Sequence, residues 1–265
     1  MVDAVVPVLN SMKTLPQCFE SIKKAIPNLY IIAVDGGSTD GSYEWLQEHA
    51  DVVFKQRRYG IGEARSQGFR LVEGPWMVTF DSDVIFPPNW LHVVKRYVKP
   101  RVACVTGQLI FGAPNDPKIA AYYREWYRVR RNMVFVTMGN NFIRTEAVRD
   151  IGGFSLLSAG EDKDTQLRFL RHGWKWVNIP SLEAYNPRTW EENLEHNRWW
   201  GRGMARLYPN PVYGFGYTVI NLLYTPHMAT KGFGGIHLMS KLIFLLGYVE
   251  GWKYWTLKKQ VSSTD

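Results

Sequence analysis

Residues 76–86 of the chain read WMVTFDSDVIF. The first five are apolar or β-favouring, which is typical of a buried strand, and the run then ends on two acids, Asp81 and Asp83, with Ser82 between them. Side chains alternate along a strand, so the two carboxylates are expected to point the same way and Ser82 the other way. Buried unpaired carboxylates are costly. We therefore expect a positively charged group to lie beside them.

Apolar strands alternate with amphipathic helices through the first hundred residues. Strands are predicted at 3–9 (DAVVPVL), 29–35 (LYIIAVD), 51–56 (DVVFKQ) and 75–83 (PWMVTFDSD), and helices at 11–26, 39–50 and 60–72. The first helix carries Leu15, Phe19 and Ile22 on one face, and Thr39 or Asp40 is placed to cap the second. Continuous apolar strands separated by helices indicate an α/β fold, a Rossmann-like mostly parallel sheet with helices on both faces.

Polar residues follow three of the predicted strands at the point where each strand ends. They are PVLNS (7–11), VDGGSTDGS (34–42) and DSD (81–83). In such sheets ligands bind beyond the carboxyl ends of the strands, so these three ends are expected to face one crevice. Paired carboxylates suit a hard divalent cation such as Mn²⁺ or Mg²⁺, although a D-x-D tripeptide alone is common in loops and helix caps.

The second part of the chain is less regular. Strands are predicted at 101–111 and 133–143, and helices at 118–131, 164–173 and 189–208, with an acidic GEDKD segment at 160–164. The tail is rich in Gly, Tyr and Phe, and its segment 237–255 is apolar almost all round, interrupted by Lys241, Glu250 and Lys253. A spanning helix needs about 20 mostly apolar residues. We therefore expect a helical tail that packs on the rest of the chain or lies in a membrane surface.

Composition narrows the class of protein. The net charge is +8 and the sequence pI about 9.4, which favours polyanionic partners but equally serves solubility. Basic residues are scattered rather than gathered, so nucleic acid is not an expected partner. Cys18 and Cys104 show neither metal-ligand spacing nor a disulfide framework. A strand-like run begins at residue 2 of the chain. A cytoplasmic location is expected, peripheral on the membrane face if the tail binds lipid.

Six segments in order resemble the family-2 glycosyltransferases of the GT-A fold. They are PVLNS, VDGGSTDGS, GEARSQG, DSD, MGNNFIRTEAVRDIGGF and GEDKDTQLRFLRHGW, and the resemblance covers about residues 2–205. It implies an inverting, metal-assisted transfer of a hexose from a UDP- or GDP-linked sugar to a hydroxyl or lipid-linked acceptor. It also implies a nucleotide-sugar-binding half at 1–100, an acceptor-binding and catalytic half at 101–205, and an extension at 206–265.

The resemblance assigns roles to individual residues. Asp162 matches the catalytic base, with Glu161 beside it, and Arg198 in EHNRW would steady the leaving diphosphate. Donor-binding positions are Pro7, Asn10, Asp35, Gly36, Arg65, Asp81 and Ser82; metal positions are Asp83, Asp81, Asn186 and His196; acceptor positions are Asn140, Trp199 and Trp200.

Three positions depart from the family pattern. Many relatives have a second aspartate where this chain has Gly36, which bears on the nucleobase contact. Many also supply a metal-binding histidine where this chain has Asn186, so either Asn186 is an oxygen ligand or His196 replaces the histidine. Glu195 stands where processive members carry glutamine, which argues against polymerisation.

Other classes of protein fit less well. A nucleotide-sugar pyrophosphorylase would open with a Gly-rich basic loop, which PVLNSMKTLP lacks, and a dehydrogenase would need G-x-G-x-x-G, where GIGEAR has Arg65 at the third glycine. A non-catalytic basic binding protein on a transferase scaffold remains an alternative, but a pure binder has no need of the DSD and GED segments.

Overall fold

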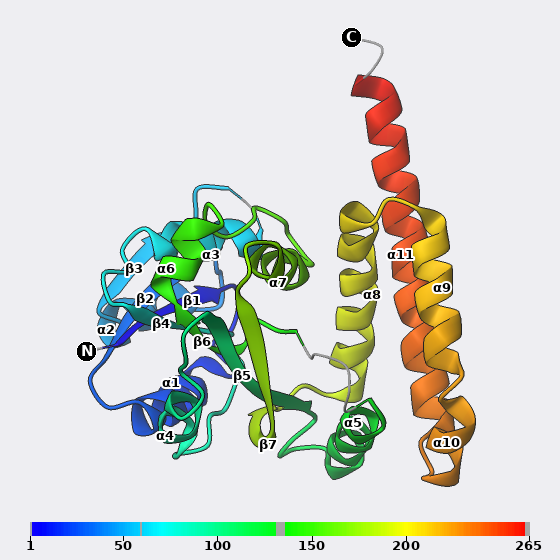
Figure 1. Cartoon of the computed structure of the whole chain (residues 1–265), viewed down its shortest axis with the longest axis horizontal. Helices are drawn as coiled ribbons and strands as arrows, with labels where there is room; N and C mark the ends of the chain where they lie inside the picture. The colour runs from blue at the N-terminus through cyan, green and yellow to red at the C-terminus, as the bar shows by residue number, and fades with distance from the viewer. Residues whose placement is uncertain (1, 59, 131–135, 263–265) are drawn as a thin grey trace. The chain divides into compact units, whose positions relative to one another are not determined.

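The computed structural model describes residues 2–58, 60–130 and 136–262, which form two compact units (Figure 1). The α/β unit comprises Met1–Pro114 and Arg131–Pro187, and the helical unit comprises Asn115–Arg130 and Arg188–Asp265. The helix at 117–129 therefore belongs with the C-terminal helices. The predicted nucleotide-sugar-binding half at 1–100, the acceptor-binding half at 101–205 and the extension at 206–265 are divisions by function rather than by packing, and they stay predictions.

A seven-stranded sheet forms the centre of the α/β unit, with the strand order β3-β2-β1-β4-β6-β5-β7. The strands are β1 (Val2–Val8), β2 (Leu29–Asp35), β3 (Val52–Lys55), β4 (Trp76–Phe80), β5 (Val102–Phe111), β6 (Asn140–Arg144) and β7 (Lys175–Asn186). β6 runs antiparallel to both of its neighbours, β4 and β5, and the remaining pairs are parallel. The predicted α/β class and mostly parallel sheet are confirmed.

Helices cover both faces of this sheet. They are α1 (Leu15–Ala25), α2 (Ser42–His49), α3 (Ile61–Phe69), α4 (Trp90–Lys95), α6 (Thr145–Asp150) and α7 (Glu161–Arg171). Because side chains alternate along β1, Val6 packs on one face of the sheet in an apolar cluster with residues of α1, α2 and α4. Val5 packs on the other face in a cluster with residues of α6 and α7. Burial of Leu15, Phe19 and Ile22 confirms the predicted inner face of α1.

Two predicted element boundaries were wrong near the strand ends. β4 ends at Phe80, because residues 81–84 form a turn in which the N–H of Val84 donates to the carbonyl of Asp81 at 3.2 Å. α2 begins at Ser42 rather than at 39, since Asp40 accepts the N–H of Ser42 at 3.0 Å. The first part of the strand predicted at 133–143 lies outside the described residues, and β6 begins at Asn140.

The helical unit contains α5 (Pro117–Val129), α8 (Trp190–Leu207), α9 (Pro211–Leu222), α10 (Thr225–Thr230) and α11 (Gly234–Ser262). Thr189 and Glu192 form a capping box that starts α8. α8 and α11 approach closely through glycines on both helices: a Cβ at Gly201 would lie 2.2 Å from the carbonyl oxygen of Phe244, and one at Gly247 2.0 Å from that of Arg198. No helix within the described residues is long and apolar enough to cross a membrane.

Candidate active site

The ends of β1, β2 and β4 meet at one edge of the sheet, as the sequence predicts. Asn10, after β1, accepts the N–H of Thr39 at 2.9 Å through its side-chain oxygen. The hydroxyl of Ser11 is hydrogen bonded to that of Ser82 at 2.7 Å. These contacts join three loops that lie far apart in the sequence, so residues from all three contribute to one site.

The turn after β2 is organised by Asp35. Its carboxylate is fully buried and accepts the N–H groups of Gly37 and Ser38 at 2.9 and 3.1 Å. A Cβ at Gly36 would lie 3.4 Å from the Cβ of Leu9, which is an ordinary contact. Asp35 therefore shapes the turn, and the predicted donor contacts of Pro7, Asn10, Asp35 and Gly36 stay predictions.

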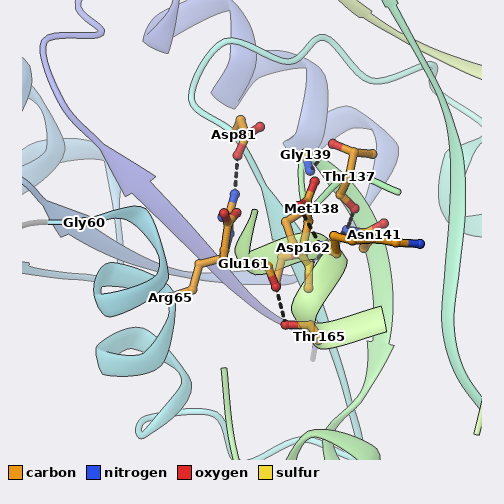
Figure 2. Close-up of polar contacts among 12 residues, drawn as sticks. Gly60, Arg65, Asp81, Thr137, Met138, Gly139, Asn141, Glu161, Asp162 and Thr165 are labelled. Atoms are coloured by element: carbon orange, nitrogen blue, oxygen red, sulfur yellow. Dashed lines mark hydrogen bonds and ion pairs between the residues drawn. The ribbon is translucent and has the colours of Figure 1, made fainter. Parts of the chain in front are cut away.

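Arg65 supplies the positive group beside Asp81, the first of the two acids after β4 (Figure 2). Its guanidinium donates from Nη2 to Oδ1 of Asp81 at 2.5 Å and from Nη1 to Oε1 of Glu161. The side chains of Arg65 and Glu161 are 1% and 7% exposed, so this ion pair is shielded from water, whereas the Asp81 side chain is 29% exposed. Arg65 thus links the DSD segment to the GED segment, which follows it by about eighty residues in the chain.

Glycines at the start of α3 explain why Arg65 reaches Glu161. A Cβ at Gly62 would lie 2.1 Å from the carbonyl oxygen of Ser155 and 2.6 Å from that of Leu157. The N–H of Gly62 also donates to the Leu157 carbonyl at 3.1 Å. The glycine therefore lets residues 155–157 lie against α3, which brings the start of α7 beside Arg65. In GIGEAR this glycine serves close backbone packing rather than a dinucleotide.

Two acids with different environments begin α7. Asp162 is partly buried, and its Oδ1 accepts the N–H of Lys163 at 2.6 Å. Burial, and next the negative charge of Glu161, raise the pKa of Asp162 to about 7. Burial also raises the pKa of Glu161, against the opposing effect of Arg65. Asp162 is therefore poised to take up and release a proton near neutral pH, as a general base requires.

Gly139 keeps the space beside Asp81 open. The N–H of Asp81 donates to the carbonyl of Gly139 at 3.4 Å, which extends the pairing of β4 with β6. A Cβ at position 139 would lie only 2.9 Å from Oδ2 of Asp81, so any other residue would displace this carboxylate. The sequence pattern indicates a role for Asn140 but gives no sign of this role of Gly139, although both belong to the MGNNFI segment.

The neighbouring Asn140 is fully buried. Its Oδ1 accepts the hydroxyl of Thr106 at 2.8 Å, and its Nδ2 donates to the carbonyl of Gln108 at 3.4 Å. The side chain thus ties β6 to β5. Its predicted contact with an acceptor stays a prediction.

The donor set at this edge fits a hard divalent cation. Ile85 and Tyr185 form an antiparallel bridge, with N–H to carbonyl distances of 2.7 and 2.9 Å, so Asn186 comes next to the turn that holds Asp83. Within the part of the chain that the structure describes, no group of three or more His, Cys, Asp or Glu side chains is arranged for a metal. Two carboxylates and an amide oxygen are nevertheless the oxygen ligands that Mg²⁺ and Mn²⁺ take when ligand phosphates complete the shell.

The remaining predicted residues lie on α8 in the helical unit. Arg198 donates from Nε to both carboxylate oxygens of Glu250 at 3.1 Å. The ring of His196 lies 5.2 Å from that of Trp199, and burial, together with Arg188, lowers the pKa of this histidine well below its usual value. Their predicted roles toward donor, metal and acceptor stay predictions.

Trp200 belongs to an apolar cluster of the helical unit. Its ring centroid lies 4.8 Å from that of Phe244 and 5.8 Å from that of Tyr217. The side chain therefore helps to pack α8 against α9 and α11, and its predicted acceptor contact stays a prediction.

The model of the glycosyl transferase family 2 matches residues 3–164, and the chain belongs to this family. Curated relatives include the glycosyltransferase GlyG of Streptococcus pneumoniae serotype 4, 31% identical over 40% of this chain and 37% of its own length. An undecaprenyl-phosphate 4-deoxy-4-formamido-L-arabinose transferase of Proteus mirabilis is 34% identical over 33% of this chain and 30% of its own. The matched part thus spans about a third of these relatives' length.

Solved structures of glycosyltransferases share the fold. A mannosyltransferase from Pyrobaculum calidifontis, in complex with GDP-Man and Mn²⁺, has a TM-score of 0.59 and 15% identity, covering 100% of this chain and 80% of its own. A glucosyl-3-phosphoglycerate synthase from Mycobacterium tuberculosis, in complex with Mn²⁺, UDP and glucosyl-3-phosphoglycerate, has a TM-score of 0.53 and 18% identity, covering 78% of this chain and 79% of its own. The GT-A fold predicted from the six segments is confirmed.

Proposed function

We propose that this chain transfers a sugar from a nucleoside-diphosphate sugar, UDP- or GDP-linked, to a hydroxyl or lipid-linked acceptor with inversion at the anomeric carbon. The observation that carries the proposal is the juxtaposition of Asp81, Arg65 and Glu161 beside Asp162, whose pKa is raised to about 7. Inversion in one step requires a carboxylate that accepts the acceptor's proton while the acceptor oxygen attacks.

The relatives support a sugar nucleotide as donor. The Pyrobaculum structure holds GDP-Man with Mn²⁺, and the Mycobacterium structure holds UDP with Mn²⁺. The Proteus relative is named for undecaprenyl phosphate, which favours a lipid-linked acceptor among the alternatives. When bound, a divalent cation would supply positive charge for the diphosphate leaving group, and Asp81, Asp83 and Asn186 are the residues that would hold it.

Asp162 and Arg65 have different roles in this proposed reaction. Asp162 accepts the proton of an acceptor hydroxyl, so that a nucleophilic oxygen forms only as it attacks. Arg65 fixes the carboxylate of Asp81 through one nitrogen and Glu161 through the other, which preorganises both segments before a donor arrives. An acceptor phosphate is already ionised at neutral pH and would need this base less than a hydroxyl does.

Titration calorimetry tests the donor site directly. UDP, GDP, CDP and dTDP are each titrated with and without Mn²⁺, and we expect one of them to bind and to require the metal. Asp83→Asn should abolish the metal requirement together with most of the affinity, since it removes a charged oxygen ligand. Binding of none of the four nucleotides in either condition would contradict the proposal.

Gly139→Ala is expected to weaken metal-dependent nucleotide binding about ten- to hundredfold, as changes that misplace a metal ligand do. The added Cβ would meet Oδ2 of Asp81 at 2.9 Å and force the carboxylate to move. Gly216→Ala is the matched control, because a Cβ there has nothing within 4 Å. Equal nucleotide affinity of the two variants in calorimetry would show that Asp81 tolerates the shift.

A further inference from the structure

The helix α9 exposes apolar side chains and buries small and polar residues, which is the opposite of the usual arrangement in a water-soluble protein. Five apolar residues on α9 and just after it are 51–73% exposed: Val212, Phe215, Val219, Ile220 and Leu223. They follow the helical spacing i, i+3, i+7, i+8 and i+11, so they share one face. The residues that α9 buries are Gly214, Thr218 and Asn221. In water such a helix would normally bury its apolar stripe.

The first half of α11 shows the same reversal. Leu238, Met239, Leu242 and Leu246 are 42–48% exposed, whereas His237, Ser240 and Lys241 are buried. The two helices contact one another, and Figure 1 shows them side by side in the helical unit. Two adjacent helices therefore both present aliphatic side chains outward, and their inner faces combine polar groups with aromatic residues such as Tyr217 and Phe244.

Specific contacts hold the polar groups inside, so the reversal is built into the packing. Nε2 of His237 lies 2.9 Å from the carbonyl oxygen of Asn221, and Nδ1 lies 3.2 Å from the hydroxyl of Tyr122. The hydroxyl of Thr218 donates to the carbonyl of Gly214 at 2.9 Å. The ammonium of Lys241 lies 4.5 Å from the ring centroid of Trp126. Rotating either helix to bury its apolar residues would break the contact between His237 and Asn221, which joins α11 to α9.

The charge of this region identifies the kind of partner. Residues 207–226 contain no charged side chain, and residues 206–265 contain six Lys or Arg against two Asp or Glu. One of these acids, Glu250, is paired with both Arg198 and Arg202. Lys241 is buried, whereas Lys231 and Lys253 are exposed. An apolar face without charges, with exposed lysines near it in the chain, complements an anionic lipid surface: acyl chains meet the face and headgroups meet these lysines.

We propose that the outer faces of α9 and of the first half of α11 dock in the plane of an anionic lipid bilayer. The helices lie in the interface rather than across it, since none of the described helices is long and apolar enough to span a membrane. The docking face belongs to the helical unit and stands independently of catalysis. Its use in presenting a lipid-linked acceptor rests on the proposed function.

Vesicle flotation of the full chain tests the docking face. Vesicles of phosphatidylcholine alone and with phosphatidylglycerol are compared at low and at physiological salt. We expect binding to the anionic vesicles, and a loss of at least about tenfold for the double variant Val219→Ser/Leu223→Ser, since each buried apolar side chain contributes well over a factor of ten. Leu71→Ser is the control, because Leu71 is 45% exposed on the α/β unit.

Two further measurements make the outcomes decisive. Thermal unfolding and nucleotide titration of the double variant should match those of the unchanged chain, which separates loss of docking from loss of fold or of donor binding. Equal flotation of the double variant and the unchanged chain overturns the proposal. It is also overturned if sedimentation velocity shows a dimer that the double variant loses while neither protein floats, because a second copy would then cover the face.

Discussion

Replacing Arg65 with methionine is expected to destabilise the α/β unit by about 3–5 kcal/mol, the usual cost of removing one partner of a buried ion pair. Arg65 is 1% exposed and Glu161 7%, so loss of the guanidinium leaves a carboxylate that water does not reach. Urea unfolding at pH 7.5 measures the change in the free energy of unfolding. The deficit should shrink as the pH falls, because the stranded carboxylates then take up protons.

A matched control separates this effect from loss of any basic side chain on α3. Arg70 is exposed just after α3, so Arg70→Met should change stability by less than about 0.5 kcal/mol. Arg65→Lys keeps one charge but cannot reach two carboxylates with a rigid fork, and it should fall between the two. A free energy of unfolding for Arg65→Met within about 1 kcal/mol of that of the unchanged chain, the spread of ordinary substitutions, would show that these ion pairs are not a major support of the site.

With a hydroxyl acceptor, Asp162→Asn is expected to lower turnover by about 10²- to 10⁴-fold, the range for loss of a general base, with donor binding retained. In the unchanged enzyme kcat/KM should rise with pH through about 7, because Asp162 must lose its proton to act. Glu161→Gln should move this rise to lower pH, since the charge of Glu161 is the second cause of the raised pKa of Asp162. Near-normal turnover of Asp162→Asn contradicts the assignment.

Stability gives a second measure of Asp162 that does not depend on knowing the substrate. Its pKa is raised in the folded chain from an ordinary value of 3.8 to about 7. The protonated carboxyl therefore stabilises the fold most below about pH 4, near the ordinary pKa of an aspartate. This contribution is lost as the pH rises to about 7. Asp162→Asn should accordingly gain stability relative to the unchanged chain above neutral pH.

Asp164→Asn is the control for Asp162. Asp164 lies in the same first turn of α7, but it forms a partly exposed pair with Arg168, at 2.8 Å. We expect a small stability loss, below about 1 kcal/mol, and a pH profile of activity like that of the unchanged enzyme. A shifted profile for Asp164→Asn would show that any acid at this helix start has the effect.

The sequence predicts the fold and part of the site because both follow from local patterns. Strand alternation, helix periodicity and the polar groups after three strands are readable along the chain, and the meeting of the ends of β1, β2 and β4 at one edge of the sheet follows from the topology. Arg65 and Glu161 are 96 residues apart, so their pairing depends on a close approach that only Gly62 allows. A glycine in GIGEAR shows no sign of which backbone will lie against it.

The helical unit was harder to predict for a different reason. The apolar segment 237–255 reads as uniformly hydrophobic, and its lysine reads as an interruption. Lys241 is in fact an inward residue and Leu242 an outward one, because the partners of α11 are helices with aromatic and polar inner faces. Hydrophobicity alone does not tell which side of a helix faces solvent when both sides carry apolar residues.

The glycine contact between α8 and α11 constrains how this protein can be dissected. Gly201 of α8 lies under the Phe244 carbonyl, and Gly247 and Gly251 of α11 lie under the carbonyls of Arg198 and Arg202. Cutting the chain near 206 would strip α8 of its backbone-to-backbone partner and expose Met204 and Ala205, which are now buried. A truncated protein would thus report on an α8 that lacks its packing partner. Point substitutions on outward residues are the way to separate the roles of the tail.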